Sequence, residues 1–189
     1  MARPHAPVAL LIVDMVNLLD FPDADRMAPS AIAAARRIKV LRERFHGRDW
    51  PVVFANDNFA RWRSDFRELV ALAAHGEGAP REIAELLAPD PRDYFILKPK
   101  HSAFLATPLP VLLGKLGVRR LLLTGMALES CILATAADAN AREFEVAIVR
   151  DAVAGLPALR RSALEALSGS GTARLVDSRG ALRWAAAGD

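Results

Sequence analysis

The chain has 189 residues, of which 52% are hydrophobic and 25% are charged, and its formal net charge at pH 7 is +3. This length accommodates one domain with a buried core but not two independent ones, so we expect a single domain over residues 1–189. The basic residues are spread along the chain, which argues against nucleic-acid binding, and the lack of a long apolar run or signal segment predicts a cytoplasmic protein that does not bind membranes.

Six short apolar runs predict six β-strands. The runs are continuous rather than alternating, as in strands that are buried on both faces of a mainly parallel sheet. They occupy residues 8–13, 52–55, 94–97, 121–123, 146–149 and 173–176.

Helical patterns separate these strands. The clearest has a 3-4-3-4 spacing that turns one apolar stripe toward a sheet, and Ser30 is its expected N-cap. The stripe consists of Ala31, Ala34, Ile38, Leu41 and Phe45. Further helices are expected over residues 79–87, 108–116, 130–143, 158–167 and 178–186. The repeated strand-then-helix units predict an α/β fold: a three-layer, doubly wound sandwich with helices on both faces of a six-stranded, mainly parallel sheet in the Rossmann-like order 3-2-1-4-5-6.

No glycine-rich phosphate loop follows the first predicted strand. Residues 14–20 read Asp-Met-Val-Asn-Leu-Leu-Asp, whereas a dinucleotide-binding fingerprint places several glycines at this point. We therefore expect no nucleotide cofactor.

Three polar residues fall at or just after the carboxyl ends of predicted strands, where open parallel sheets bind their ligands. Asp14 closes the first strand, Lys98 closes the third, and Cys131 follows the fourth at the expected start of a helix. A helix N-terminus and a nearby ammonium lower a cysteine pKa from about 8.5 toward neutrality, so Lys98 would favour a thiolate. Asp14 would accept the thiol proton and pass it to a leaving amine, while helix-start amides near Ala127 and Cys131 would hold an oxyanion.

Each of these three residues also has a structural interpretation. Asp14 could cap a helix or bind a loop amide, and Lys98 could be an exposed lysine at a strand end. Cys131 is the only cysteine, so it forms no internal disulfide, and it could be a small buried side chain in an alanine-rich helix. The set of three favours catalysis because it supplies a nucleophile, a base and a cation together.

Three longer motifs surround these residues. They are Ala-Leu-Leu-Ile-Val-Asp-Met at residues 9–15, Leu-Lys-Pro-Lys-His-Ser-Ala-Phe at residues 97–104, and Leu-Thr-Gly-Met-Ala-Leu-Glu-Ser-Cys-Ile-Leu-Ala-Thr-Ala-Ala-Asp-Ala at residues 123–139. With them the chain resembles the isochorismatase-like cysteine hydrolases, a family that includes nicotinamidases and N-carbamoylsarcosine amidohydrolase.

The resemblance implies a role for each residue. It makes Asp14 the general acid and base, Lys98 the ammonium that stabilises the thiolate, and Cys131 the nucleophile that forms a thioester-type intermediate. Lys100 is the rival lysine, but Lys98 directly ends the strand. The resemblance also implies a cis peptide bond between residues 126 and 127, and a homo-oligomer, either a dimer or a tetramer.

Two departures from the family narrow the expected activity. Nicotinamidases carry metal-binding histidines after the second strand, but residues 54–62 here read Phe-Ala-Asn-Asp-Asn-Phe-Ala-Arg-Trp. His75 is more typical of a surface helix end and His101 is ambiguous, so we expect no metal. Isochorismatases proper lack the nucleophilic cysteine, so Cys131 argues against that activity.

The expected function is therefore cysteine-dependent hydrolysis of a small amide, ureido or carbamoyl-type C–N bond. The alternatives are a hydrolase of another C–O or C–N bond and a catalytically silent binding or oligomerising module of the same fold. Aromatic and polar residues near the site are the candidates for binding the small-molecule substrate, although Phe59 and Trp62 could instead anchor a loop or a subunit contact. The candidates are Phe21, Asn56, Asp57, Phe59, Trp62 and Leu128.

Overall fold

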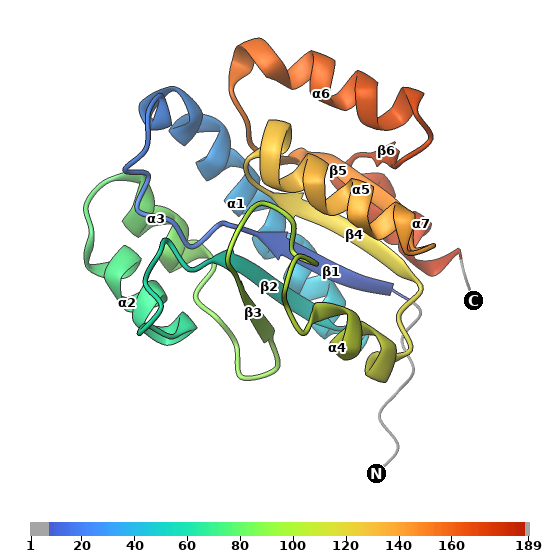
Figure 1. The fold of residues 1–189 in the computed structure, drawn as a ribbon, viewed down its shortest axis with the longest axis horizontal. Helices are drawn as coiled ribbons and strands as arrows, with labels where there is room; N and C mark the ends of the chain where they lie inside the picture. Colours follow the sequence, from blue (N-terminus) through green and yellow to red (C-terminus); the bar gives the residue numbers. More distant parts are fainter. Residues whose placement is uncertain (1–7, 188–189) are drawn as a thin grey trace.

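The structure, a computed structural model, describes residues 8–187. Within these residues six strands form one sheet in the order β3-β2-β1-β4-β5-β6, and every neighbouring pair is parallel (Figure 1). The predicted strand order is confirmed. The strands are β1 (Val8–Val13), β2 (Val52–Asp57), β3 (Tyr94–Lys98), β4 (Arg120–Gly125), β5 (Glu145–Val153) and β6 (Arg174–Val176).

Seven α-helices and one π-helical turn connect the strands within residues 8–187. They are α1 (Ala24–His46), α2 (Phe66–His75), α3 (Ala79–Leu86), α4 (Leu109–Leu116), the π-helical turn η1 (Leu128–Ile132), α5 (Leu133–Ala141), α6 (Pro157–Gly169) and α7 (Ser178–Ala186). Helices α1, α2, α3 and α7 pack on one face of the sheet, and α4, α5 and α6 cover the other, which is the nearer face in Figure 1. The predicted three-layer sandwich is confirmed.

The continuous apolar runs supply both layers of the core. Successive side chains of a strand point to opposite faces, so Leu10 and Ile12 of β1 pack under α1, while Leu11 and Val13 pack under α4 and α5. All four side chains are fully buried. This double burial explains why the strand sequences show no polar alternation.

The first helix begins seven residues earlier than predicted, because its N-cap is not Ser30. Asp23 occupies the N-cap position, and Ala24 and Met27 extend the buried stripe. Ser30 lies inside the helix, where its hydroxyl donates to the carbonyl oxygen of Met27 at 2.8 Å. The predicted N-cap is wrong because the buried face continues N-terminal to Ala31 through Ala24 and Met27, with Pro29 inside the helix.

Helix α2 is absent from the sequence prediction, which treats the residues before it as one long loop. Its N-cap is Asp65, whose carboxylate accepts the Glu68 backbone N–H at 2.9 Å. Phe66, Leu69 and Ala73 form its buried face. An acidic residue followed three positions later by glutamate resembles a capping box, so a start signal was present in the sequence.

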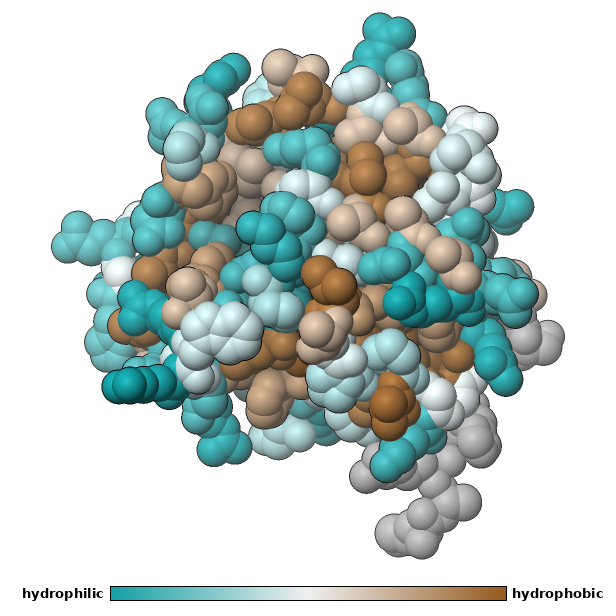
Figure 2. All heavy atoms as spheres, in the orientation of Figure 1, coloured by the Kyte–Doolittle hydropathy of each residue, from teal (hydrophilic) through white to brown (hydrophobic). Residues whose placement is uncertain are grey.

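Hydrophilic side chains surround small, separate groups of hydrophobic ones on the face drawn in Figure 2. The large hydrophobic residues that remain exposed include Trp62, Phe95 and Val111. None of the helices in residues 8–187 has the length and apolar content needed to cross a membrane.

Candidate active site

The polar residues of the site come from the carboxyl edge of the sheet. Asp14 directly follows β1, Asp57 ends β2 and Lys98 ends β3, while Cys131 lies in the π-helical turn that follows β4. Because these four strands are adjacent and parallel, their ends meet at one edge. Asp14 has a φ of 52°, in the left-handed region that few non-glycine residues adopt, so the chain turns sharply where its carboxylate leaves the sheet.

The ammonium of Lys98 lies at the centre of the cluster. Its Nζ is 2.8 Å from Asp14 Oδ2, 3.5 Å from Asp57 Oδ2 and 3.6 Å from Cys131 Sγ, and it donates to the Lys100 carbonyl oxygen at 3.1 Å. The Lys98 side chain is 0% exposed. The structure therefore brings Asp14, Lys98 and Cys131 into direct contact, although they are far apart in the chain.

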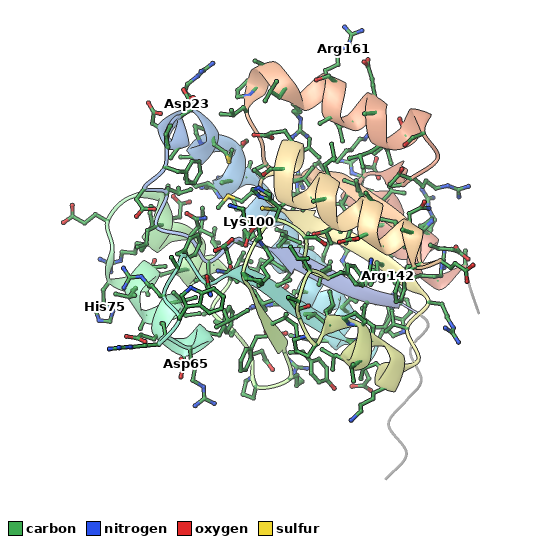
Figure 3. All side chains as sticks on the ribbon, viewed as in Figure 1. Asp23, Asp65, His75, Lys100, Arg142 and Arg161 are labelled. Carbon is green, nitrogen blue, oxygen red and sulfur yellow. The ribbon has the colours of Figure 1, made fainter. Side chains whose placement is uncertain are left out.

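Lys100 takes a different position from Lys98. It lies in the loop after β3, labelled in Figure 3, and it is exposed. Only its backbone carbonyl reaches the ammonium of Lys98. The lysine that ends the strand is thus the one whose side chain enters the cluster.

Two backbone hydrogen bonds fix the carboxylates. Asp14 Oδ1 accepts the Asp57 N–H at 2.6 Å, and Asp57 Oδ1 accepts the Phe59 N–H at 2.7 Å. Each acid therefore has one oxygen held by the backbone and the other directed toward Lys98. The Asp14 hydrogen bond depends on the placement of β1 beside β2, which the local sequence does not show, whereas the Asp57 hydrogen bond is a local contact between residues two apart.

Burial and charge pairing oppose each other in the cluster. Burial raises the pKa of Asp14 above its ordinary value, and the nearby Lys98 only partly offsets this. It lowers the pKa of Lys98, but the Asp14 carboxylate and Cys131 outweigh burial, so the net pKa is raised. Burial and the negative charge of Asp14 raise the pKa of the Cys131 thiol to about 11. The expected shift of that pKa toward neutrality is therefore wrong, because one ammonium does not offset burial beside a carboxylate.

The π-helical turn presents the nucleophile next to an unusual backbone segment. The peptide bond between Met126 and Ala127 is cis, at the position that the resemblance implies. The N–H of Ala127 has no hydrogen-bond partner within residues 8–187, whereas the N–H of Leu128 donates to the Ala154 carbonyl. The Ala127 amide is therefore available beside Cys131.

Gly125 is required for this segment to approach β1. Its φ is 108°, and a Cβ placed there would lie 2.1 Å from the Val13 carbonyl oxygen. No side chain fits this contact. The glycine thus lets β4 end directly against the strand that carries Asp14.

A cavity of about 340 Å³ opens onto the cluster, a volume suited to a small molecule. Asp14 and Cys131 both line it, as do three of the predicted substrate-binding residues, Phe21, Asp57 and Phe59. The predicted catalytic carboxylate and thiol therefore face the same space.

Three other predicted substrate-binding residues lie away from this cavity. The Asn56 side chain is used internally: its Oδ1 accepts the Val16 N–H at 3.0 Å and its Nδ2 donates to the Val16 carbonyl at 2.9 Å. Leu128 is 0% exposed within the apolar layer under α4 and α5. Trp62 is 76% exposed and lines a separate surface hollow with Arg61. Asn56 and Leu128 therefore have structural roles, and Trp62 lies on the surface.

Several cavity residues have no role in the sequence analysis. His101 is exposed in the loop after β3, and its Nδ1 lies 3.8 Å from Cys131 Sγ. Asn17, Asp20 and Ser130 also line the cavity. Asn17 and Asp20 follow the first strand at the carboxyl edge of the sheet, and that position was the signal that could have identified them.

Within the described chain, no three histidine, cysteine, aspartate or glutamate side chains are grouped so that they could hold a metal ion. The histidines that the sequence analysis considered are separated. His75 ends α2, where its Nδ1 contacts the Ala71 carbonyl oxygen at 2.6 Å, and Figure 3 shows it far from Lys100.

Comparisons with known proteins identify the family of this chain. YaaI of Bacillus subtilis (strain 168), an uncharacterized isochorismatase family protein, is 36% identical over 149 residues, which cover 79% of this chain and 81% of YaaI. The ureidoacrylate amidohydrolase RutB of Enterobacter sp. (strain 638) is 30% identical over 182 residues, which cover 80% and 79%. The crystal structure of N-carbamoylsarcosine amidase from Thermoplasma acidophilum aligns with a TM-score of 0.68 and 25% identity, over 90% of this chain and 96% of that one. The isochorismatase domain matches residues 8–179, and the chain therefore belongs to the isochorismatase family.

Proposed function

We propose that this protein is a cysteine-dependent hydrolase that cleaves the C–N bond of a small amide, ureido or carbamoyl compound. The contact of Asp14 and Cys131 with the same buried ammonium, at the wall of one small cavity, carries this proposal. The names of two relatives, ureidoacrylate amidohydrolase and N-carbamoylsarcosine amidase, support the bond type.

The first half of the reaction forms the acyl-enzyme. Because the pKa of the Cys131 thiol is raised to about 11, the resting nucleophile is a thiol, and its proton must leave as sulfur attacks. The Asp14 carboxylate, whose pKa is raised by burial, takes that proton. Sulfur bonds to the carbonyl carbon, the C–N bond breaks, and the proton on Asp14 passes to the leaving amine.

Lys98 makes this proton transfer possible by stabilising negative charge on both partners. Its Nζ lies between Asp14 Oδ2 at 2.8 Å and Cys131 Sγ at 3.6 Å. Charge that moves from the carboxylate to the sulfur therefore stays beside the same cation. A preorganised charge of this kind requires no solvent rearrangement during the reaction.

The oxyanion of the tetrahedral intermediate is held by backbone amides. The free N–H of Ala127, adjacent to the cis peptide bond, and the N–H of Cys131 are the donors in this proposal. In the second half, Asp14 takes a proton from water, whose oxygen attacks the thioester carbon. The C–S bond breaks, the acid leaves, and the proton returns to the sulfur.

The test is a screen of small amides, ureido acids and carbamoyl compounds for release of ammonia or amine, combined with intact-mass measurement of a covalent adduct. Cys131→Ala and Asp14→Asn should each abolish turnover, while Asp25→Asn, an exposed acid in the first turn of α1, should leave it unchanged. Turnover that persists in Cys131→Ala would contradict the cysteine mechanism. No turnover of any compound, together with no adduct, would favour a binding module of the same fold.

A further inference from the structure

The cavity wall carries an excess of negative charge. The side chains of Asp14, Asp20 and Asp57 all line it. Among the described residues that line the cavity there is no lysine or arginine, and His101 is the one basic side chain. A substrate therefore enters a space whose fixed charges are mainly carboxylates.

Lys98 offsets one of the three carboxylate charges, but it offers no free hydrogen-bond donor to an incoming ligand. Its side chain is 0% exposed and does not line the cavity. Its ammonium already contacts two carboxylates, the Lys100 carbonyl and the Cys131 sulfur, so its three N–H donors are in use. An anionic group of a substrate would therefore find no free donor on this lysine, and the three lining carboxylates outnumber its single positive charge.

The Asp20 carboxylate is uncompensated. It lies in the exposed segment between β1 and α1, and within residues 8–187 no hydrogen bond or ion pair engages it. Asp57 is partly neutralised, since its Oδ1 accepts the Phe59 N–H and its Oδ2 lies 3.5 Å from Lys98 Nζ. Asp20 is therefore the lining acid whose charge acts most directly on a substrate.

Part of the remaining wall is apolar. Phe21, Phe59 and Met126 line the same cavity as the acids. Apolar walls exclude water and strengthen the repulsion between a bound anion and nearby carboxylates. They also fit an alkyl group, and an aromatic face attracts a cation.

We propose that the substrate of this site has no carboxylate at the end remote from the scissile amide, so that its remote end is uncharged or cationic. This inference rests on the amidase function proposed above and specifies its substrate class. Asp20 acts as the specificity-determining residue, because its charge repels anionic substrates and attracts cationic ones.

Three matched primary amides test the proposal. Succinamide is uncharged, succinamate replaces its second amide with a carboxylate, and 4-aminobutanamide carries an ammonium. We expect kcat/KM for succinamide and 4-aminobutanamide to exceed that for succinamate by at least about tenfold, because the carboxylates of Asp14, Asp20 and Asp57 that line the cavity repel the carboxylate of succinamate. Equal or faster hydrolysis of succinamate would overturn the proposal, and it would point to His101 as an anion-binding residue.

Charge substitution at Asp20 gives a second measurement. Asp20→Asn should raise the ratio of kcat/KM for succinamate to that for succinamide, and Asp20→Lys should raise it further. Asp25→Asn, which removes an exposed acid of α1 that does not line the cavity, should leave the ratio unchanged. A general loss of folded protein or of activity cancels in this ratio of two kcat/KM values. The ratio therefore measures the preference of each variant between the charged and the uncharged substrate.

The outcomes separate the two proposals. If no amide of the set or of the wider screen is hydrolysed and Cys131 forms no adduct, the amidase function itself fails. If amides are hydrolysed but the ratio is the same in wild type, Asp20→Asn and Asp20→Lys, the function stands and the proposed substrate class is wrong.

Discussion

Replacement of Lys98 by methionine should destabilise the protein strongly, because it leaves the buried Asp14 carboxylate without its cation. At the observed separation of 2.8 Å, the attraction between the two charges is about 6 kcal/mol at an effective dielectric constant of about 20. Removing one partner of a buried pair typically costs about 3–5 kcal/mol, and we expect a loss of that size in the free energy of unfolding.

The same substitution makes stability depend on pH in a defined direction. Without Lys98 the pKa of Asp14, already raised by burial, rises further. A carboxyl group whose pKa is raised by folding stabilises the native state below its unfolded pKa, and this contribution is lost as pH rises through the folded value. The deficit of Lys98→Met relative to wild type should therefore shrink as the pH falls.

Urea denaturation followed by far-UV circular dichroism, at several pH values, measures both effects. Lys39→Met removes an exposed lysine of α1 and is the matched control, with an expected change within about 0.5 kcal/mol. The double variant Asp14→Asn/Lys98→Met should recover much of the lost stability, although neither it nor Lys98→Met should turn over substrate. A loss below about 1 kcal/mol in Lys98→Met would refute the description of a charged, buried pair.

Three further predictions concern the thiol, metal dependence and the missed helix. Iodoacetamide should alkylate native Cys131 more slowly than a free cysteine at pH 7.5, with a rate that rises toward pH 11, because its pKa is raised to about 11; a fast reaction at neutral pH would contradict this. Dialysis against EDTA should leave activity unchanged, because residues 54–62 contain no histidine, and a loss restored by zinc would show otherwise. Asp65→Ala should lower the free energy of unfolding by about 1 kcal/mol through loss of the α2 N-cap, and an unchanged urea midpoint would argue against the Glu68 hydrogen bond.

The sheet was predictable from the sequence because its strands are buried on both faces. Such strands are continuous apolar runs, and residues 8–13 match β1 without error. Helix boundaries were harder to predict from the sequence. The apolar stripe from Ala31 suggested a start at Ser30, although the buried side chains of Ala24 and Met27 extend α1 toward the N-terminus. The sequence alone does not show that burial of Ala24 and Met27 outweighs the backbone hydrogen bond that Pro29 cannot donate.

The contact between Asp14, Lys98 and Cys131 was predictable because each follows the end of a parallel strand. The residues that line the cavity walls were not predictable from the sequence. Asn56 and Asp57 are neighbours in β2, and their side chains point to opposite faces of the sheet, so only the strand register decides that Asp57 lines the cavity. The raised pKa of Cys131 also depends on burial, which the spacing of residues along the chain does not reveal.

The arrangement of the site along the sheet edge separates chemistry from selectivity. The reactive groups are anchored at the ends of β1, β3 and β4, whereas Phe21, Asp20 and Phe59 lie in the connecting segments that leave β1 and β2. A mutant library restricted to residues 17–22 and 58–64 would thus diversify the entrance while it leaves the reactive groups in place.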